Sequence, residues 1–325
     1  MAPANRKQPI RSKSSDSRYS LMEFMAEFPD DDACLDYLWR TRYSPDGEHA
    51  ECPKCKATRV FKHYVTAQRR QSWTCTGCGH HVQPTAGTIF HKSSTSLHLW
   101  FYALYLITST RCGISAKQLE RELGVTYKTA WRMFNLIRNQ LMAGDVTTPL
   151  TGKVEVDETY LAKSKRLGTH GRSGRSEGER TVLGMVERGG RVVARHVPDA
   201  KADTLMPHIK RHVLPATLVF TDEYKSYGRL TKAGYHHHRI NHSAKVYVEG
   251  DVHTQYMDGF WSLFKRGMSG VYHSVSAKWL QSYLDEYAFR YNHREWARRR
   301  KGVRRVSVGE AMFRVLLVRA AQPLG

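Results

Sequence analysis

The stretch Lys153-Val-Glu-Val-Asp-Glu-Thr-Tyr160 places apolar residues at alternate positions around an embedded carboxylate, Asp157. Alternation of this kind predicts a β-strand. Acidic residues are depleted from strands, so an Asp inside one calls for a functional explanation. Glu155 and Glu158 flank Asp157, and we expect both of them to point to the opposite face of the sheet.

The elements that follow this strand predict the fold class. Residues 181–186 and 191–197 form a hairpin across two glycines, and residues 203–213 read as a helix. Thr217-Leu-Val-Phe-Thr-Asp222 is a buried strand that ends on a second acid. The order strand, strand, strand, helix, strand predicts an α/β, ribonuclease-H-like fold, in which an acid in the first strand lies beside an acid at the end of the fourth.

The stretch from His253 to Gly267 predicts a helix that carries a third acid. Its polar residues recur every three or four positions and therefore share one helical face; they are Gln255, Asp258, Ser262 and Lys265. Apolar residues pack behind that face; they are Phe260, Leu263 and Phe264. Asp258 is preferred as the third metal ligand because it is anionic, and Gln255 remains the alternative.

Other side chains near these elements compete for the same role. Glu223 follows Asp222 outside the strand. Three more candidates precede the helix, where Gly250 indicates a loop, and rank below Asp258; they are Glu249, Asp251 and His253. The run His236, His237 and His238 suits a metal ion, but such a run is more often an exposed polar strand or loop.

Two Cys-x-x-Cys pairs, Cys52-Pro-Lys-Cys55 and Cys75-Thr-Gly-Cys78, have the spacing of a zinc ribbon. Each pair forms a tight turn, and tetrahedral Zn²⁺ joins two turns that have too little core to fold alone. We therefore predict a structural zinc site with four thiolate ligands, against the alternative of disulfides or ordinary thiols. Cys34 and Cys112 lie outside the pattern, and we expect them to be buried small hydrophobic residues.

Residues 96–142 read as helices, among them an apolar helix over 100–108. Ser115 caps a helix, Gly124 turns the chain and Thr126 caps a second helix, which is the form of a helix-turn-helix. Early positions of the second helix in such a motif reach base edges, and here they are Tyr127, Lys128 and Arg132. A helical hairpin that only packs is the alternative; the basic side chains favour DNA contact.

The charge of the chain favours nucleic acid as a partner. Its 325 residues include 51 Lys and Arg against 30 Asp and Glu, a net charge of +21, so its field attracts polyanions. The 41% of hydrophobic residues and seven Trp indicate a packed globular protein rather than a basic tail. No apolar run approaches the roughly 20 residues of a membrane span. Residues 1–18 lack the apolar core of a signal peptide, so we expect a cytoplasmic protein without membrane contact.

Two further basic surfaces are expected. Within the ribbon, residues 60–65 and 71–74 alternate like a hairpin whose exposed basic and aromatic side chains suit DNA phosphates and a solvated face equally. Near the C-terminus, a helix over 276–290 is followed by a dense basic run and by an apolar helix over 311–318. The basic run includes Arg298, Arg299 and Arg300. It suits phosphate binding that weakens steeply with salt, and a solvated tail is the alternative.

These patterns predict six segments along the chain. They are a disordered basic arm (1–18), an N-terminal helical segment (19–48), the zinc ribbon (49–92), a helical region with the helix-turn-helix (93–143), a ribonuclease-H-like catalytic domain (150–290) and a basic C-terminal helical tail (291–325). Within the second segment, apolar spacing predicts short helices over 21–28 and 33–39. Within the catalytic domain, a Gly-, Ser- and Arg-rich loop is expected over 163–180.

Several motifs of this chain occur together in one known family. They are Val156-Asp-Glu-Thr-Tyr160, Phe220-Thr-Asp-Glu-Tyr-Lys-Ser-Tyr227, and His253-Thr254 through Lys265-Arg266 with Tyr272-His273 and Tyr291-Asn292. With them the chain resembles, over nearly its whole length, the bacterial insertion-sequence transposases of the ISXO-like (fifteen-ninety-five) group. Members of the group carry Glu where this chain has Asp258, and often Asn where it has Gln255.

The resemblance implies a DDE-type transposase. Its partner is double-stranded DNA, both the terminal inverted repeats of its own element and the target. Paired ends imply a homodimer or a larger assembly, and the implied location is bacterial and nucleoid-associated.

The chemistry of DNA strand transfer accounts for three acids. Two Mg²⁺ or Mn²⁺ ions activate the nucleophile and stabilise the leaving oxygen of an in-line displacement. Mg²⁺ prefers oxygen ligands and keeps several waters, so two or three carboxylates suffice. We expect Asp157 to bridge both ions, Asp222 to hold one and Asp258 the other. Lys265 and Arg266 are expected to contact DNA phosphates.

The sequence therefore predicts a transposase that cleaves and joins the ends of an insertion sequence. Two alternatives stay open. One is a catalytically inactive or domesticated DNA-binding relative. The other is a ribonuclease-H-like nuclease that hydrolyses DNA without joining it.

Overall fold

The computed structural model describes residues 19–65, 71–144, 147–161, 180–240, 253–273, 275–299 and 302–324. The chain divides into two compact units: the first ends at Leu141 and resumes at Val308, and the second is Met142–Ser307. The expected arm over 1–18 and nearly all of the expected loop over 163–180 lie outside the described residues. Across the described ranges, no helix has both the length and the apolar character to cross a membrane.

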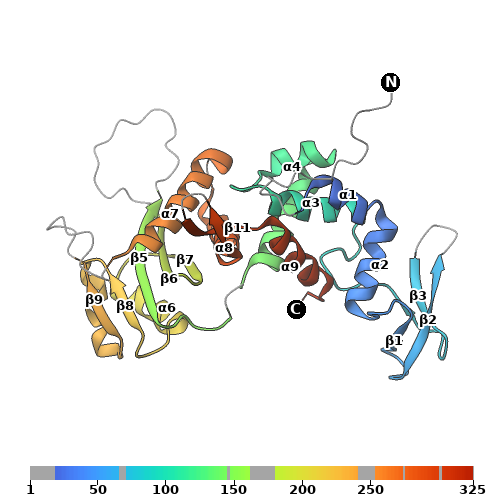
Figure 1. Ribbon diagram of the computed structural model, residues 1–325, viewed down its shortest axis with the longest axis horizontal. Coiled ribbons are helices and arrows are strands. Elements are labelled where there is room, and N and C mark those ends of the chain that lie inside the picture. Colours follow the sequence, from blue (N-terminus) through green and yellow to red (C-terminus); the bar gives the residue numbers. More distant parts are fainter. Residues whose placement is uncertain are drawn as a thin grey trace. The chain divides into compact units, whose positions relative to one another are not determined.

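The first unit combines helices with a small sheet (Figure 1). Its helices are α1 (Leu21–Glu27), α2 (Asp31–Arg42), α3 (Leu97–Ser109), α4 (Ala116–Leu123), α5 (Tyr127–Leu136) and α9 (Gly309–Ala321). Its strands are β1 (His49–Glu51), β2 (Thr58–Val65), β3 (Gln71–Cys75) and β4 (His81–Val82), antiparallel in that order. Side-chain caps start the first two helices: Ser20 and Glu23 form a capping box for α1, and Asp30 caps α2.

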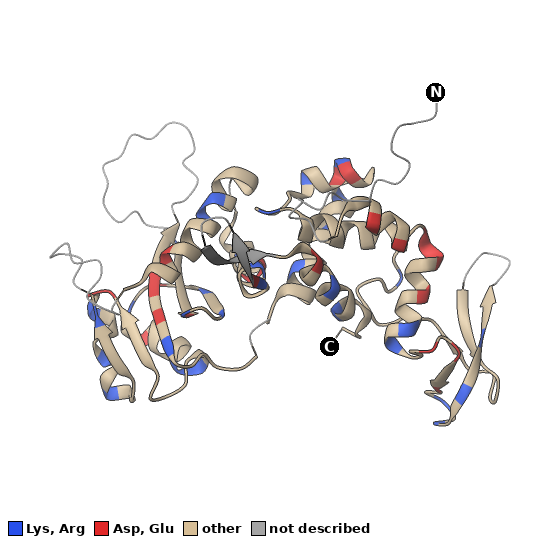
Figure 2. Cartoon of the chain, viewed as in Figure 1, with Lys and Arg blue, Asp and Glu red and all other residues tan. Residues whose placement is uncertain are grey.

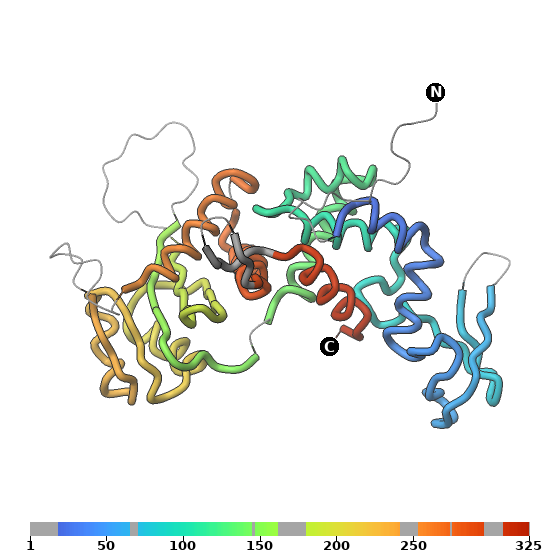
Figure 3. The backbone as a smooth tube through the Cα atoms, in the orientation of Figure 1, coloured from blue at the N-terminus to red at the C-terminus, as the bar shows by residue number. Residues whose placement is uncertain are grey.

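The last helix of the chain packs within the first unit (Figure 3). Phe313 of α9 lies 5.9 Å from the ring of Phe24, and Gly309 approaches the backbone of α3, where an added Cβ would lie 3.1 Å from the Thr108 oxygen. The segment predicted as a helical tail over 291–325 is helical at 291–292 and in α9, but between them the prediction missed the antiparallel strands β10 (Arg294–Arg299) and β11 (Gly302–Ser307). The Val residues of the second strand favour β structure, which the basic run masked.

The second unit has a five-stranded sheet in the order β7-β6-β5-β8-β9. Its strands are β5 (Lys153–Leu161), β6 (Arg180–Glu187), β7 (Val192–Val197), β8 (Leu218–Thr221) and β9 (His236–Arg239); its helices are α6 (Ala202–His212), α7 (Gln255–Gly267) and α8 (Ala277–Asn292). β6 is antiparallel to both of its neighbours, and β5, β8 and β9 are parallel. This is the predicted ribonuclease-H-like α/β fold.

Alternation along β5 sends neighbouring residues to different layers of the second unit. Val154 and Val156 join a buried cluster with Leu205 and Ile209 of α6. The other face of the strand lies under α7 (Figure 1). The sheet therefore has α6 against one face and α7 against the other, and the acids of β5 are divided between them.

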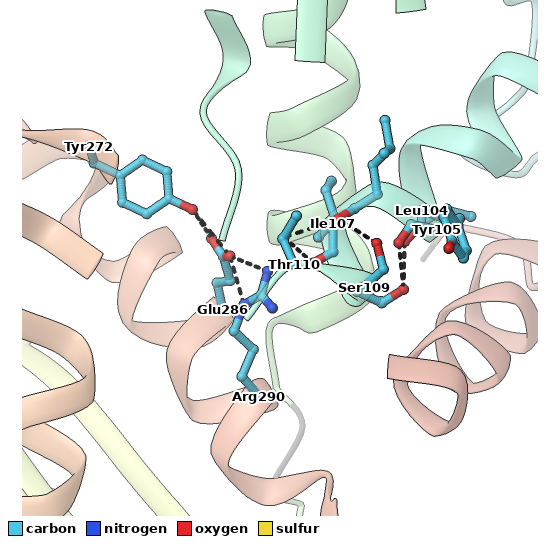
Figure 4. Close-up of polar contacts among 10 residues, drawn as sticks. Leu104, Tyr105, Ile107, Ser109, Thr110, Tyr272, Glu286 and Arg290 are labelled. Atoms are coloured by element: carbon cyan, nitrogen blue, oxygen red, sulfur yellow. Dashed lines mark hydrogen bonds and ion pairs between the residues drawn. The ribbon is translucent and has the colours of Figure 1, made fainter. Parts of the chain in front are cut away.

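Side chains of α8 fasten it to the sheet and to the end of α7. Asn292 accepts a hydrogen bond from the Val192 amide (2.8 Å) and donates one to the Val192 oxygen (3.2 Å) on β7. Buried Glu286 pairs with Arg290 at 2.9 Å and accepts the Tyr272 hydroxyl at 3.1 and 3.2 Å (Figure 4). Because Tyr272 follows α7 in the chain, these bonds fix the C-terminal end of α7 against α8.

Candidate functional site

Asp157 and Asp222 come from neighbouring parallel strands. Strand β5 carries several acidic positions (Figure 2, red). Asp157 lies half-buried within this strand, and Asp222 directly follows β8. Continuing the pairing of β5 with β8 brings Asp222 alongside Asp157. Burial raises the pKa of Asp157 to about 7, and the negative charges of Glu158, Asp222 and Asp258 add to this effect. The three acids therefore influence one another electrostatically, although within the described residues their carboxylate oxygens do not gather as a group placed for one metal ion.

Asp258 belongs to the solvent-facing side of α7, as the helical spacing predicts. This side consists of the exposed residues Gln255, Asp258, Ser262 and Lys265. The buried side consists of Met257, Phe260, Trp261, Phe264 and Gly267, and Trp261, three residues after Asp258, lies at the edge of this side next to Asp258. Gln255 and Asp258 share one face, so the helix itself does not decide between them as a ligand.

Trp261 connects α7 directly to Asp157, a contact that sequence reasoning missed. Its indole Nε1 donates a hydrogen bond of 2.8 Å to Asp157 Oδ2. Gly184 pairs with Asp157 across β5 and β6, and a Cβ at Gly184 would lie 2.6 Å from Trp261 Cζ2. A glycine opposite the acid therefore leaves room for the indole. The signal in the sequence was the position of Trp261, one helical turn after Asp258.

The expectation that Glu155 points away from the face of Asp157 is wrong. Residues two apart on a strand share a face, and Glu155 accepts hydrogen bonds from the amides of Tyr256 (2.9 Å) and Met257 (3.0 Å) on α7. Glu158 is one residue from Asp157 and lies on the α6 face, as expected, where it accepts the hydroxyl of Tyr227. The two glutamates therefore have different surroundings.

The other candidate ligands fall into three groups. Glu223 is exposed, and Glu249 and Asp251 lie outside the described residues. The nitrogen Nδ1 of His253 lies 3.1 Å from Glu155 Oε1. The histidine run forms β9, where Nε2 of His237 lies 2.9 Å from the Thr221 hydroxyl and burial lowers the pKa of this His to about 4. A neutral His237 bonded to the neighbouring strand is a structural residue of the sheet.

The four predicted cysteine ligands come together and fit a zinc site. The Sγ atoms of Cys52, Cys55, Cys75 and Cys78 all lie within 4.8 Å of one another. Within the described part of the chain, this is the one group of three or more His, Cys, Asp or Glu side chains placed for a shared metal ion. Trp39 of α2 stacks on Trp73 at 4.9 Å and packs against the same cluster. Cys34 is buried as expected, whereas Cys112 is exposed, so that prediction was wrong.

Helices α4 and α5 have the predicted helix-turn-helix form. Ser115 accepts from the Gln118 amide at the start of α4, Gly124 ends that helix at φ 62°, and Thr126 caps α5. The residues proposed to contact bases are all exposed; they are Tyr127, Lys128 and Arg132. The guanidinium of Arg132 lies 5.8 Å from the ring of Trp100, which orients it.

The remaining predicted DNA-binding residues are basic. Arg266 is exposed on α7, and its Nε donates to the Ser262 oxygen at 3.1 Å. Arg298 and Arg299 lie in β10, with side chains outside the description, and Arg300 lies outside the described residues altogether. Their contacts with DNA stay predictions.

Comparison with known proteins defines the class. Residues 149–292 match the family model of the ISXO2-like transposase domain. A Halobacterium salinarum protein, described as an uncharacterized protein in transposable element ISH50, is 30% identical over 256 residues, which are 74% of this chain and 84% of the relative. A Haemophilus influenzae uncharacterized transposase-like protein is 31% identical over 99 residues, 30% of this chain and 79% of that protein. These matches place the chain among the transposases.

More particularly, the chain belongs to the ISXO2-like transposase family. Two solved structures also align with this chain. The Mos1 strand transfer complex has 10% sequence identity and a TM-score of 0.28, over 66% of this chain and 73% of that chain. A pre-cleavage Mos1 transpososome has 12% sequence identity and a TM-score of 0.27, over 68% of this chain and 75% of that chain. The fold assignment rests on the strand order and register.

Proposed function

We propose that this transposase cleaves and joins the ends of an insertion sequence by metal-dependent phosphodiester transfer. The catalytic carboxylates of the proposal are Asp157, Asp222 and Asp258. The observation that carries it is the attachment of α7 to β5, in which Trp261, one turn after Asp258, donates a hydrogen bond to Asp157. This contact supports a site shared by the helix and by the two parallel strands.

The donor set fits a divalent cation, because carboxylate oxygens are the ligands that Mg²⁺ prefers. Asp157, Asp222 and Asp258 would hold the metal ions. When bound, Mg²⁺ or Mn²⁺ supplies activation of the nucleophile and stabilisation of the leaving oxygen. Trp261 orients the Asp157 carboxylate and stabilises its anionic form. Lys265 is exposed two turns after Asp258 and contributes a positive charge to the DNA phosphate.

The first unit supplies the recognition of DNA in this proposal. The four cysteines hold a structural Zn²⁺, and the ribbon and the helix-turn-helix bind the terminal inverted repeats. Arg266 and the C-terminal arginines contact phosphates of the element ends or of the target. Joining requires paired ends, so the working form is at least a homodimer. Its place of action is the cytoplasm, at the bacterial nucleoid.

The test is a strand-transfer assay with Mg²⁺ and with Mn²⁺ on DNA that carries the terminal repeats. Asp157→Ala and Asp157→Asn should lower nicking and joining by roughly 10³-fold or more and leave DNA binding intact. Asp203→Asn, which changes an exposed acid of α6, serves as the control that keeps activity. Joining retained by Asp157→Ala contradicts the carboxylate assignment.

The wild-type protein distinguishes the two alternatives in the same assay. Tight binding of the ends without nicks identifies an inactive DNA-binding relative. Nicked products without joined products identify a nuclease.

A further inference from the structure

The first turn of α7 is held from the sheet rather than by its own capping residue. Within the described residues, the side chain of Thr254 at the N-cap makes no capping hydrogen bond, although Thr suits that position. The amides of Tyr256 and Met257 instead donate to Oε2 of Glu155, at 2.9 and 3.0 Å. The first amides of a helix need acceptors, and a carboxylate there also stabilises the helix dipole. Strand β5 therefore caps helix α7.

Glu155 is fully buried, and its charge is balanced by neighbours that also reach the start of α7. Arg188 Nε donates to Glu155 Oε1 at 2.8 Å, and Arg188 Nη2 donates to the backbone oxygen of His253 at 2.8 Å. The nitrogen Nδ1 of His253 lies 3.1 Å from the same Oε1. A buried carboxylate is costly unless it is paired and hydrogen-bonded, and among the described residues its partners are on α7, just before it, or on Arg188.

Glu155 and Asp157 attach α7 to the same face of the same strand. The two residues are about 7 Å apart along β5, at roughly 3.3 Å per residue. Glu155 holds the helix at Tyr256 and Met257, and Asp157 holds it at Trp261. Asp258 lies between these two attachments along α7, so together they set its height and rotation over the strand.

We propose that Glu155 is a positioning residue, which holds the start of α7 so that Asp258 meets Asp157 at a shared divalent cation. It does not touch the reacting atoms, because it is fully buried and its oxygens are engaged by α7 and Arg188. This inference rests on the proposed function. It adds that the metal affinity of the acids depends on a fourth, buried carboxylate.

The far end of α7 has its own attachment, so the loss of Glu155 acts mainly on the end that carries Asp258. A Cβ at Gly267 would lie 1.5 Å from the Tyr287 hydroxyl oxygen, which shows how closely α7 and α8 approach. Phe264 packs edge-on against Tyr287, with ring centroids 5.4 Å apart. This packing holds the last turns of the helix when the first turn is loosened.

The experiment compares Glu155→Gln with Glu187→Gln in the full-length protein. Glu187 is a matched control, because it also accepts a backbone amide (Thr151, 2.8 Å) and pairs with an arginine (Arg191, 3.3 Å), with both partners away from α7. Three quantities are measured: amide hydrogen exchange by mass spectrometry over residues 253–267, Mn²⁺ affinity by calorimetry, and binding of end DNA.

We expect Glu155→Gln to accelerate exchange in the first turn of α7 and to weaken Mn²⁺ binding by about 10- to 100-fold, with unchanged DNA binding. Glu187→Gln should change neither exchange over 253–267 nor Mn²⁺ affinity. A Glu155→Gln protein that is less stable but keeps wild-type exchange in α7 and wild-type Mn²⁺ affinity overturns the proposal, because Glu155 is then only a core residue.

A second variant covers the case in which Glu155→Gln does not fold. Arg188→Lys keeps the positive charge and removes the paired geometry of the guanidinium, which bridges Glu155 and the His253 oxygen. Arg188→Lys should also accelerate amide exchange in the first turn of α7 and weaken Mn²⁺ binding, each by less than Glu155→Gln. If this variant keeps both the wild-type Mn²⁺ affinity and the wild-type exchange, the proposal is overturned. If wild type binds Mn²⁺ but neither nicks nor joins DNA, the proposed function fails, while weaker Mn²⁺ binding by Glu155→Gln still supports the positioning role.

Discussion

Gly184→Ala should push α7 away from the strand that carries Asp157. A Cβ at this position would lie 2.3 Å from Met257 Cε and 2.6 Å from Trp261 Cζ2. The methionine end is flexible, whereas the indole is rigid and must retreat by about 0.8 Å to reach an ordinary contact of 3.4 Å. A retreat of that size takes the 2.8 Å hydrogen bond between Trp261 and Asp157 beyond its normal range.

The energetic cost combines two effects. Overpacking costs about 1–3 kcal/mol, and the lost hydrogen bond to a carboxylate costs about 1.5–3 kcal/mol, while replacing a strand glycine returns about 0.5–1 kcal/mol. We therefore expect the free energy of unfolding to fall by about 1.5–5.5 kcal/mol. For a unit of this size, that lowers Tm by roughly 10 °C.

The assay is urea and thermal unfolding, with the indole Nε1–H of Trp261 followed by NMR. Gly259→Ala is the control, because Gly259 is in α7, the helix that carries Trp261, and an added Cβ there would have nothing within 4 Å. That variant should gain up to about 1 kcal/mol from helix propensity. If Gly184→Ala is as stable as Gly259→Ala and leaves the Trp261 signal unmoved, α7 does not pack on β5 as described.

Three further predictions concern pH, zinc and salt. The folded-state pKa of Asp157 is raised from 3.8 to about 7, so in metal-free protein the free energy of unfolding should fall as pH rises from about 4 to about 7, because the unfolded chain releases this proton first. Denaturation measured at several pH values should show this fall in the free energy of unfolding for the wild type, and the fall should be absent from Asp157→Asn. Cys52→Ala should abolish zinc binding and unfold the ribbon locally, whereas Cys112→Ala, outside the cluster, should keep the zinc content measured by mass spectrometry. Lys128→Ala should weaken the binding of end DNA, and if Lys128 contacts one phosphate the slope of log affinity against log salt should shrink by about 1; an unchanged slope argues against that contact.

The strands and helices that carry a strong period were predictable from the sequence. The alternation around Asp157 and the apolar run before Asp222 predicted β5 and β8, and their order along the chain predicted the ribonuclease-H-like sheet. The cysteine spacing predicted the cluster of four thiols. In these segments the local pattern and the tertiary structure agree, so the sequence alone was enough to predict the two strands and the cysteine cluster.

Contacts between distant segments were beyond the sequence. The hydrogen bond from Trp261 to Asp157 spans 104 positions and depends on a glycine in a third element, Gly184. The spacing of apolar residues along α9 indicates that one face of the helix is buried, but it does not indicate which part of the chain covers that face. The assignment of α9 to the first unit was therefore not predictable. The error over Glu155 was different, since strand alternation already assigns residues two apart to one face.

Two acids of β5, Glu155 and Asp157, show why residue type is insufficient to assign a ligand. A carboxylate has about four lone-pair positions. Glu155 uses them for two α7 amides and Arg188, with His253 close by, and it has no exposed surface. Within the described residues Asp157 accepts one hydrogen bond, from Trp261, and stays half-buried. A cation needs free oxygen lone pairs with access to water, so Asp157 suits the ligand role and Glu155 the anchor role, although they stand two residues apart on one face.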